Sequence, residues 1–441
     1  MGTAATTIAA GLETAIRDGQ LAPGARLPTH RDLARRHGVA LNTASHAMRL
    51  LAARGLVVGE TGRGSFVRTP NHVDAGSFAL QAGAPELIDL ARNVMPLPGL
   101  AERFERAAHA VLRRGRDGLL DYQPHAGRAA DRAAGAQWLS RAGHLPNDPS
   151  RVLVCAGAQH AITVALLAVA KPGDAVAAEA LTWPGLRASA AALGLELLPV
   201  PMDGDGLRPR ALLRLAARRR IAALYCMPSL QNPTAATMPA ARRETVAALA
   251  RRLDFQIIED DAYGFLASEG PAPLPPLAAL VPERCWHVRS LSKSLAPGLR
   301  TAWLMVPPEQ GGRAAEMIRA TIWSTPPLGP AIASLWVADG TAGALEAERR
   351  REAAARQGIA AAVLPASSCR TRPTSMHVWL ELPAGMRAQA MVEQAAAAGV
   401  RIMPGAAFGI GCAPNAVRLS LCAPPARADL ERALSIVAAL R

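Results

Sequence analysis

The sequence predicts a multidomain protein in which a small winged helix-turn-helix domain (α+β) precedes a large α/β domain. Residues 1–67 contain three helical patterns followed by a hairpin pattern. Residues 68–87 mix Pro, Gly, Asn and Ala without periodicity, which is typical of a linker. After them, apolar strand-like runs alternate with alanine-rich helical stretches, a pattern that favours a buried and largely parallel sheet.

The length of the chain also favours more than one domain, because 441 residues exceed what a single core usually holds. We expect a DNA-binding domain at 1–69, a linker at 70–87 and a second domain at 88–441. Treated as a flexible chain, the linker region spans roughly 25 Å. The two domains are therefore expected to be tethered without having to pack on each other.

In the first domain, Pro28 and Gly38 bracket the second helical pattern, and Asn42 can cap the third. We expect helices at 8–18, 29–37 and 42–54, and hairpin strands at 56–58 and 65–67. The third helix places four apolar residues on one face, which we expect to be its inner face: Ala44, Ala47, Met48 and Leu51.

In the second domain, the strands are expected where short apolar runs stand between helical patterns. These runs lie at 152–154, 175–178, 221–225, 255–258, 287–288 and 301–306.

Charge gives the first indication of a partner. The net charge of +14 and the pI near 10.8 favour an anionic partner. Residues 1–70 hold nine arginines against four acidic residues, which favours nucleic acid contact at this end. Two further arginine runs, 218–220 and 349–351, are expected to be solvated helix faces.

The six cysteines are scattered and include no C-x-x-C pair, which fits a reducing compartment and buried packing. No apolar run is long enough to span a bilayer, and the chain does not start with a basic segment followed by an apolar core. We expect a soluble cytoplasmic protein without a membrane partner or a metal site.

The scarcity of lysine in the chain indicates one candidate for amine chemistry. Only two of the 49 Lys and Arg residues are lysines, Lys171 and Lys293. Lys171 lies in a Lys-Pro-Gly-Asp sequence, which is typical of a solvated turn. A desolvated lysine loses its proton and attacks aldehydes, whereas arginine stays charged. Lys293 is therefore the candidate for Schiff-base chemistry.

Other polar residues favour an anionic aldehyde that contains a ring. Ser290 and Ser292 flank the lysine, and Arg300 follows in a Pro-Gly turn that can return it towards a phosphate. The Gly-Ala-Gln sequence at 157–159 stands between a strand and a helix, where backbone N–H groups bind anions. Asp260 ends an apolar strand, and a carboxylate there needs a cationic partner such as a protonated pyridine nitrogen.

The N-terminal residues resemble the GntR family of bacterial DNA-binding domains, through Leu-Pro-Thr-His-Arg-Asp-Leu-Ala at 27–34, Asn42-Thr43 and Gly-Arg-Gly-Ser-Phe-Val at 62–67. The resemblance places the third helix in the major groove and the 62–64 turn in the wing. It implies DNA contacts from Arg31, Asn42, Thr43, Ser45, His46, Arg49, Arg63 and Gly64. Ala40-Leu41 replaces the usual Ser-Arg, which removes a common phosphate contact. The alternative is a winged helix used only for protein contacts or dimerisation.

The second domain resembles fold-type I aminotransferases of class I, which have a large, mostly parallel sheet domain and a small α+β domain. Together with the GntR-like head it resembles the MocR subfamily of pyridoxal 5'-phosphate-dependent regulators. The resemblance implies that Lys293 binds the cofactor aldehyde, Asp260 the ring nitrogen, and Asn232 and Tyr263 the ring oxygen. Trp183 would stack on the ring, where relatives commonly carry Tyr.

The same resemblance implies a phosphate site formed by Ala158, Gln159, Ser290, Ser292 and Arg300. Tyr122 would reach the phosphate of a neighbouring subunit, which implies a homodimer, and Arg418 would bind the α-carboxylate of an amino acid. Taken singly, Asp260, Trp183 and Arg418 also suit structural roles, as a helix cap, core packing and a surface ion pair.

The expected function is a transcriptional regulator that binds operator DNA and senses pyridoxal phosphate, or an amino acid or amine effector, by exchange at Lys293. The alternative is an aminotransferase acting on an amino acid and a 2-oxo acid. A third possibility is a scaffold that binds no cofactor.

Overall fold

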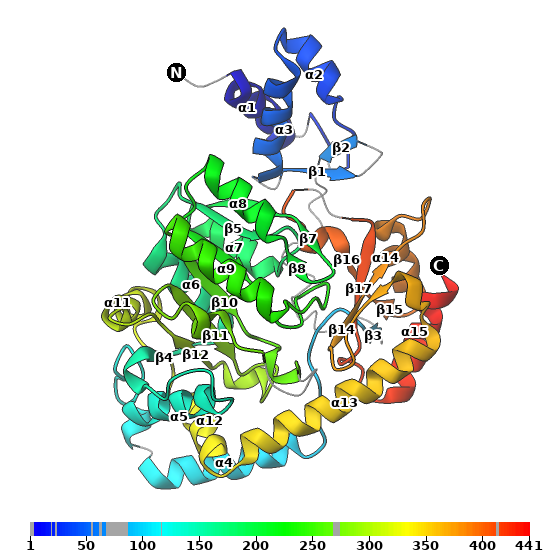
Figure 1. Cartoon of the computed structure of the whole chain (residues 1–441). Coiled ribbons are helices and arrows are strands. Elements are labelled where there is room, and N and C mark those ends of the chain that lie inside the picture. Colours follow the sequence, from blue (N-terminus) through cyan, green and yellow to red (C-terminus); the bar gives the residue numbers. More distant parts are fainter. Residues whose placement is uncertain are drawn as a thin grey trace.

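The structure is a computed structural model. It describes residues 4–18, 20–22, 24–53, 56–60, 64–67, 87–115, 117–267, 274–411 and 414–441. Arg63 and nearly all of the expected linker lie outside these ranges. Figure 1 shows the N-terminal domain as a small unit beside a much larger body.

The first domain is a winged helix. It consists of α1 (Ala4–Arg17), α2 (His30–His37), α3 (Leu41–Ala53), β1 (Val57–Glu60) and β2 (Gly64–Val67), and the two strands pair antiparallel. The Thr29 side chain caps α2 by accepting a hydrogen bond from Asp32 N at 3.2 Å. Gly38, with φ of +62°, ends the same helix.

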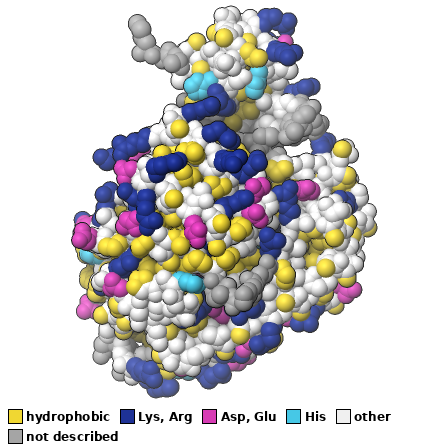
Figure 2. All heavy atoms as spheres, viewed as in Figure 1, with side chains coloured by type: hydrophobic (Ala, Val, Ile, Leu, Met, Phe, Trp, Pro, Cys, Tyr) yellow, Lys and Arg dark blue, Asp and Glu magenta, His cyan; other side chains and the backbone are white. Residues whose placement is uncertain are grey.

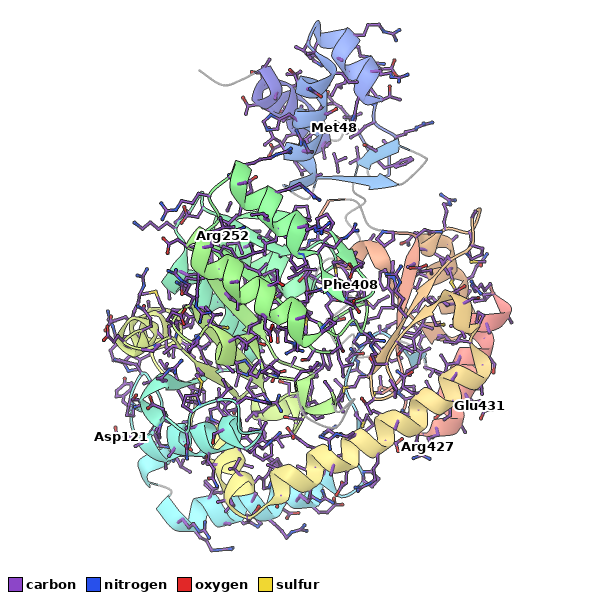
Figure 3. All side chains as sticks on the ribbon, viewed as in Figure 1. Met48, Asp121, Arg252, Phe408, Arg427 and Glu431 are labelled. Carbon is purple, nitrogen blue, oxygen red and sulfur yellow. The ribbon has the colours of Figure 1, made fainter. Side chains whose placement is uncertain are left out.

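The core of the winged helix lies between its helices and the hairpin. The four residues expected on the inner face of the third helix are all buried, which confirms that prediction. They pack with Ile8 of α1 and Leu33 of α2, and Figure 3 labels Met48 of this core. The first helix begins at Ala4, earlier than the expected residue 8, because Ala5 extends its buried stripe.

The body is built on a seven-stranded sheet of order β4-β12-β11-β10-β9-β5-β6. All neighbours pair in parallel except β12, which is antiparallel to both β4 and β11. The strands are β4 (Val152–Cys155), β5 (Ala175–Glu179), β6 (Glu196–Val200), β9 (Ala223–Cys226), β10 (Gln256–Asp260), β11 (Cys285–Ser290) and β12 (Ala302–Met305). The predicted α/β class and six predicted strands are confirmed. The edge strand β6 is half-exposed and contains Pro199, so its apolar pattern is too weak to predict.

Helices cover both faces of this sheet. One apolar cluster joins one face to α4 (Leu100–Gly115), α5 (Ala129–Ser140), α8 (Pro209–Arg218), α9 (Ala240–Leu253), α10 (Leu277–Leu280) and α12 (Leu328–Ala338). A second cluster joins the other face to α6 (Ala158–Val169), α7 (Pro184–Ala192) and α11 (Gly311–Ile322). Alternate residues of β4 belong to the two clusters, as the period of two in a strand requires. A short hairpin, β7 (Met202–Asp203) and β8 (Gly206–Leu207), precedes α8.

The long helix α13 (Thr341–Val363) connects the large sheet to a small α+β subdomain (Figure 1). Its antiparallel sheet has the order β13-β14-β17-β16. The elements are β13 (Cys369–Arg370), β14 (His377–Glu381), β16 (Met403–Pro404), β17 (Ala416–Ser420), α14 (Ala388–Ala397) and α15 (Arg427–Ala439). The first strand of the body also belongs to this small subdomain, because β3 (Ile88–Asp89) pairs in parallel with β15 (Val400–Arg401).

Two features of this arrangement bear on function. The carboxyl ends of β5, β9 and β10 meet at one edge of the large sheet, because these strands are parallel. None of the helices in the described ranges has the length and apolar content that a membrane crossing requires.

Candidate functional site

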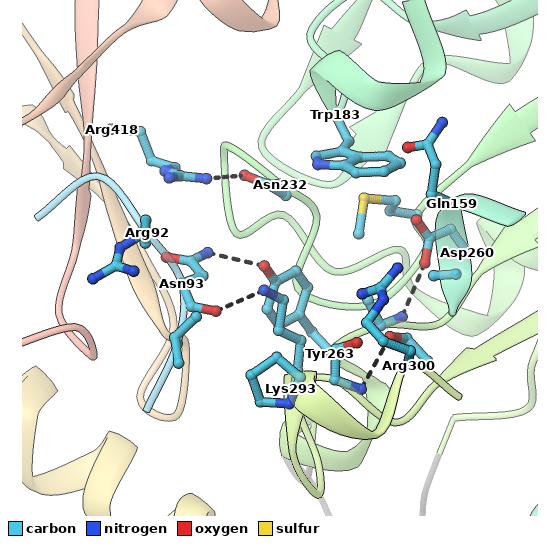
Figure 4. Close-up of a pocket in the computed structure, with 17 residues that line it drawn as sticks. Arg92, Asn93, Gln159, Trp183, Asn232, Asp260, Tyr263, Lys293, Arg300 and Arg418 are labelled. Carbon is cyan, nitrogen blue, oxygen red and sulfur yellow. Dashed lines mark hydrogen bonds between the residues drawn. The ribbon is translucent and has the colours of Figure 1, made fainter. Parts of the chain in front are cut away.

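A cavity of about 280 Å³ lies between the carboxyl edge of the large sheet, the 92–94 segment and β17 (Figure 4). Ten of the eleven predicted cofactor-binding residues line it, together with the predicted substrate arginine, Arg418. The ten are Ala158, Gln159, Trp183, Asn232, Asp260, Tyr263, Ser290, Ser292, Lys293 and Arg300. These residues are dispersed over more than 140 positions of the sequence, yet the fold brings them to one place.

Lys293 follows the end of β11 and reaches back across the cavity. Its Nζ donates a hydrogen bond to Asn93 O at 2.6 Å. Burial, followed by the positive charge of the nearby Arg418 guanidinium, lowers the pKa of this amine to about 8. A neutral, nucleophilic amine is therefore accessible close to neutral pH.

Asp260 ends β10 at the floor of the cavity. Its Oδ2 accepts a hydrogen bond from Tyr225 Oη at 2.6 Å, and its Oδ1 accepts one from Ala262 N at 3.1 Å. Burial nevertheless raises the pKa of Asp260 to about 6. Within the described part of the chain no cation forms an ion pair with it, so a cationic ligand atom would lower that pKa and keep the carboxylate charged.

Tyr225 was not predicted as part of the site. It belongs to the apolar strand β9, and its hydroxyl is fully buried against Asp260. Burial, followed by the Asp260 charge, raises the pKa of Tyr225, so the hydroxyl remains a donor. A tyrosine inside an apolar run gives no sequence signal of such a role.

Asn93 was also missed, although it connects two walls of the cavity. Its Nδ2 donates to Tyr263 Oη at 2.9 Å and lies 3.1 Å from His377 Nδ1. Burial lowers the pKa of His377 to about 3 and raises that of Tyr263 to about 12, so both are neutral. The buried Asn93 Oδ1 has no hydrogen-bond partner among the described residues.

Arg418 projects from β17 and is almost completely buried, with 2% of its surface exposed. It donates to Asn232 Oδ1 at 3.0 Å and to Ala91 O, and its Cζ lies 5.0 Å from the centre of the Phe408 ring. Burial lowers its pKa to about 10. In the described ranges it pairs with no carboxylate and its Nε has no partner, which excludes the surface ion pair considered above. A buried guanidinium of this kind favours an anionic ligand.

The opposite end of the cavity suits a phosphate. Gly157, with φ of +89°, turns the chain from β4 into the N-terminus of α6. A Cβ at Gly157 would lie 2.7 Å from Arg300 Nη2, so glycine is needed for the arginine to approach this turn. Arg300 Nη2 also donates to Ala156 O at 3.3 Å. The guanidinium and the helix N-terminus thus form a site for an anion.

Two other predicted residues at this end have local partners. The Gln159 side chain donates to Gly185 O at 3.0 Å and to Ser189 Oγ at 2.6 Å, which turns its amide towards α7. Ser290 Oγ accepts from Ser292 N at 3.3 Å. Trp183 stands at the N-cap of α7, on the same wall as Gln159 in Figure 4.

Tyr122 is the predicted cofactor residue that does not line the cavity. Its side chain is 84% exposed and contacts Trp323 edge to face, with 6.0 Å between ring centroids. An action across a subunit boundary, as predicted, requires such an outward position.

Five of the eight predicted DNA-binding residues belong to α3. Asn42, His46 and Arg49 of α3 are exposed, and Thr43 is half-buried. These four line a shallow groove beside the start of α1. The remaining predicted contacts are placed as follows: Arg31 is exposed on α2, Ser45 Oγ lies 3.1 Å from His30 Nδ1, Gly64 is exposed at the start of β2, and Arg63 lies outside the described residues.

The cavity as a whole fits a phosphorylated pyridine aldehyde. A buried carboxylate stands where a ring nitrogen would need one, and a lysine of lowered pKa stands where an aldehyde would react. Arg300 and the α6 N-terminus would suit the phosphate, and Arg418 would suit a second anion.

Comparisons with known proteins agree with this chemistry. Residues 85–437 match the aminotransferase class I and II family, and residues 4–67 match the gntR family of bacterial regulatory proteins. The chain is 28% identical over 433 residues to the uncharacterized HTH-type transcriptional regulator YdeF of Bacillus subtilis, covering 98% of this chain and 92% of that protein. It is 30% identical over 300 residues to the HTH-type pyridoxine biosynthesis transcriptional regulator PdxR of Corynebacterium glutamicum, covering 66% of this chain and 63% of that protein.

Among solved structures, the body is similar to LysN, an α-aminoadipate aminotransferase from Thermus thermophilus in complex with N-(5'-phosphopyridoxyl)-L-leucine. The identity is 28% and the TM-score 0.72, with 83% of this chain and 96% of that chain covered.

Proposed function

Since this chain belongs to the class I and II aminotransferase family and begins with a gntR-family domain, we propose that it is a pyridoxal phosphate-dependent transcriptional regulator. It binds operator DNA through the winged helix and senses pyridoxal phosphate, or an amino acid or amine, at Lys293. We expect it to work in the cytoplasm, where its DNA target lies.

One observation carries the proposal. A cavity with a lysine of lowered pKa, a buried aspartate and a buried arginine that pairs with no carboxylate among the described residues occurs in the same chain as a DNA-binding head. Neither feature alone distinguishes a regulator from an enzyme or from a simple DNA-binding protein. Their combination supports a sensor that reports to DNA, and the names of two similar proteins, both HTH-type regulators, agree with it.

When bound, pyridoxal phosphate supplies an aldehyde that condenses with amines and a ring that withdraws electrons. Lys293 would hold the aldehyde carbon, and the Asp260 carboxylate would accept the ring N–H. Tyr225 keeps that carboxylate oriented by donating to Oδ2. Asn232 and Tyr263 would bind the ring oxygen, Trp183 would cover one face of the ring, and Ala158, Gln159, Ser290, Ser292 and Arg300 would surround the phosphate.

The buried positive charge of Arg418 determines which kind of effector the cavity favours. Its buried charge has no carboxylate partner in the described part of the chain, so an incoming carboxylate would both pair with it and replace lost solvation. We therefore propose an amino acid, or an amine that shares part of this site, as the effector. Such a ligand shifts DNA affinity only as far as it prefers one arrangement of the heads over another.

A homodimer is part of the proposal. The exposed Tyr122 lies with the exposed Leu120 and Trp323 on loops beside α5 and α11, where a second subunit can cover them. Tyr122 would then reach the phosphate of the partner's cofactor. Two winged heads in one dimer suit an operator with two half-sites.

The second candidate function is transamination. In such an enzyme the Lys293 amine would move a proton and Arg418 would bind an α-carboxylate; the lowered pKa of the amine and the burial of the arginine favour these roles. The body's similarity to an aminoadipate aminotransferase also favours this alternative.

A paired assay separates the two functions. Purified protein loaded with pyridoxal phosphate is mixed with a random DNA pool, and the bound fragments are sequenced. In parallel, it is tested for amino group transfer from a set of amino acids to 2-oxoglutarate. The regulator predicts a shared sequence motif among the bound fragments and negligible turnover. Rapid turnover without a motif would overturn it in favour of the enzyme.

A further inference from the structure

Helix α8, on the outside of the body, carries a stripe of arginines. Arg210, Arg214 and Arg218 are spaced by four residues, which places them on one side of the helix. The segment 206–220 contains six arginines and no acidic residue. Arg210, Arg214, Arg218 and Arg220, here called the α8 face, are all exposed.

The α8 face is not neutralised by its surroundings. The acidic residues nearby are engaged elsewhere: Glu196 pairs with Arg219, and Asp203 and Asp205 pair with Arg242. Within the described residues, none of the four arginines of the α8 face forms an ion pair. Figure 2 shows dark blue basic side chains over this part of the body, at the end nearest the winged helix.

The stripe does not serve the stability of α8. Like charges four residues apart destabilise a helix by about 0.2–0.5 kcal/mol per pair. Arg210 also lies in the first turn, where the helix dipole disfavours a cation and where α8 has no acidic residue. The inner side of the helix packs through Ala211 and Leu212 and needs none of these charges. An external anion explains the stripe better than the fold does.

We propose that the α8 face is a second DNA-contacting surface, which binds the phosphate backbone beside the site held by the winged helix. The proposal rests on the proposed DNA-binding function and goes beyond it, because it assigns DNA contact to the aminotransferase-like body.

Geometry and charge agree with a backbone contact. Arg210 and Arg218 are eight residues apart, so the stripe extends over roughly 12 Å of helix. Phosphates follow each other by about 3.4 Å along the axis for each strand, so this length spans several of them. Guanidinium groups bind phosphate well but without base information. The α8 face therefore adds affinity without changing the sequence that is recognised.

The test uses the full-length protein loaded with pyridoxal phosphate. R210Q/R214Q/R218Q removes three charges from α8 and keeps residues that favour helix. The matched control, R313Q/R351Q/R387Q, removes the same net charge from exposed positions on α11, on α13 and before α14. DNA affinity is measured against salt concentration, with random-sequence duplexes of about 60 base pairs and with the fragments that the protein selects.

For the α8 variant we expect the slope of log affinity against log salt to become less steep by about 2–3, because each lost phosphate contact removes about 0.9. The selected motif and the cofactor spectrum stay as in the wild type, and the control keeps the wild-type slope. An unchanged slope in the α8 variant, or an equal change in the control, overturns the proposal while DNA binding stands. If the wild-type protein binds neither duplex, the proposed function fails as well.

Discussion

Lys293 is set apart from an ordinary lysine by its enclosure and by its neighbour Arg418. Burial is the main cause of its lowered pKa, and the Arg418 charge adds to it. At pH 7, an amine with a pKa of about 8 is roughly 10% neutral, whereas an ordinary lysine is neutral in well under about 0.1% of molecules. The site therefore prepares the amine before any ligand arrives.

This preparation predicts a pH dependence. The rate at which cofactor-free protein takes up pyridoxal phosphate, followed by absorbance, should rise with pH and reach its midpoint near pH 8. Arg418→Gln removes a positive charge, so the pKa of Lys293 rises and the midpoint moves to higher pH. Arg351→Gln, a change at an exposed residue that does not line the cavity, should leave it in place. A wild-type midpoint above about pH 10 would contradict the enclosed amine.

Asp260 and Tyr225 give a second prediction at this scale. Asp260→Asn removes the buried charge that, in our proposal, would pair with the ring nitrogen, and we expect affinity for pyridoxal phosphate to fall by about 3 kcal/mol or more. Tyr225→Phe removes only a donor to that carboxylate and should weaken binding by about 1.5 kcal/mol.

The same tyrosine affects the pH range. Its hydrogen bond lowers the pKa of Asp260, so Tyr225→Phe raises that pKa. Since binding needs the carboxylate, affinity in the variant should be lost at a higher pH as the solution is acidified. Equilibrium dialysis across pH 5–8 measures both effects. Equal losses in the two variants, or a shift towards lower pH, would be inconsistent with this account.

A site residue could be predicted from the sequence only where its neighbours in the chain form a recognisable pattern. Lys293, Asp260 and Arg300 stand beside serines, a strand end or a Pro-Gly turn, and these local patterns indicate their chemistry. Tyr225 and Asn93 carry no such pattern. Asn93 reaches the cavity only because the chain enters the body alongside the small subdomain, a contact that no local sequence window contains.

At the scale of elements, the turn from β4 into α6 determines the phosphate end. Gly157→Ala would bring a Cβ to 2.7 Å from Arg300 Nη2 and force the arginine away. We expect affinity for pyridoxal phosphate to fall at least tenfold. Gly173→Ala is the matched control, because Gly173 has a similar φ of +90° but no atom within 4 Å of such a Cβ.

Both glycine variants should lose about 1–2 kcal/mol of stability from the strained backbone. Cofactor titration and thermal unfolding separate the two effects. If both variants bind the cofactor equally well, the proposed phosphate site is wrong.

Helix α13 corrects one prediction made from charge alone. The arginine run at 349–351 was expected to be a solvated face, but Arg349 is buried. Its guanidinium donates to the carbonyl oxygens of Met95, Ser294 and Leu295, at 2.6, 3.1 and 2.5 Å. It therefore connects the loop after Lys293 to the helix that links the two subdomains. Arginine runs look alike in sequence, and only tertiary contacts distinguish a buried one from an exposed one.

For the whole molecule, the sequence predicted the order of the domains and the fold class of each. The winged helix, the α/β body and most strands followed from periodicity and from glycine and proline positions. Periodicity did not predict β6 or the short strands of the small subdomain, which are two to five residues long. Three of the strands, β13, β15 and β16, are only two residues long, which is too few positions for a period to appear. The longer β14 and β17 contain buried polar residues, among them His377 and Arg418, which interrupt their apolar pattern.

We propose that one chain couples the chemistry at Lys293 to DNA binding. The most direct measurement compares DNA affinity of the full-length protein with and without pyridoxal phosphate, for the wild type and for Lys293→Ala, on the fragments that the wild type selects. We expect loading to change the affinity or the footprint of the wild type by at least fivefold, the lower range of allosteric coupling, and to leave Lys293→Ala unchanged. Identical binding by loaded and cofactor-free wild-type protein would contradict it.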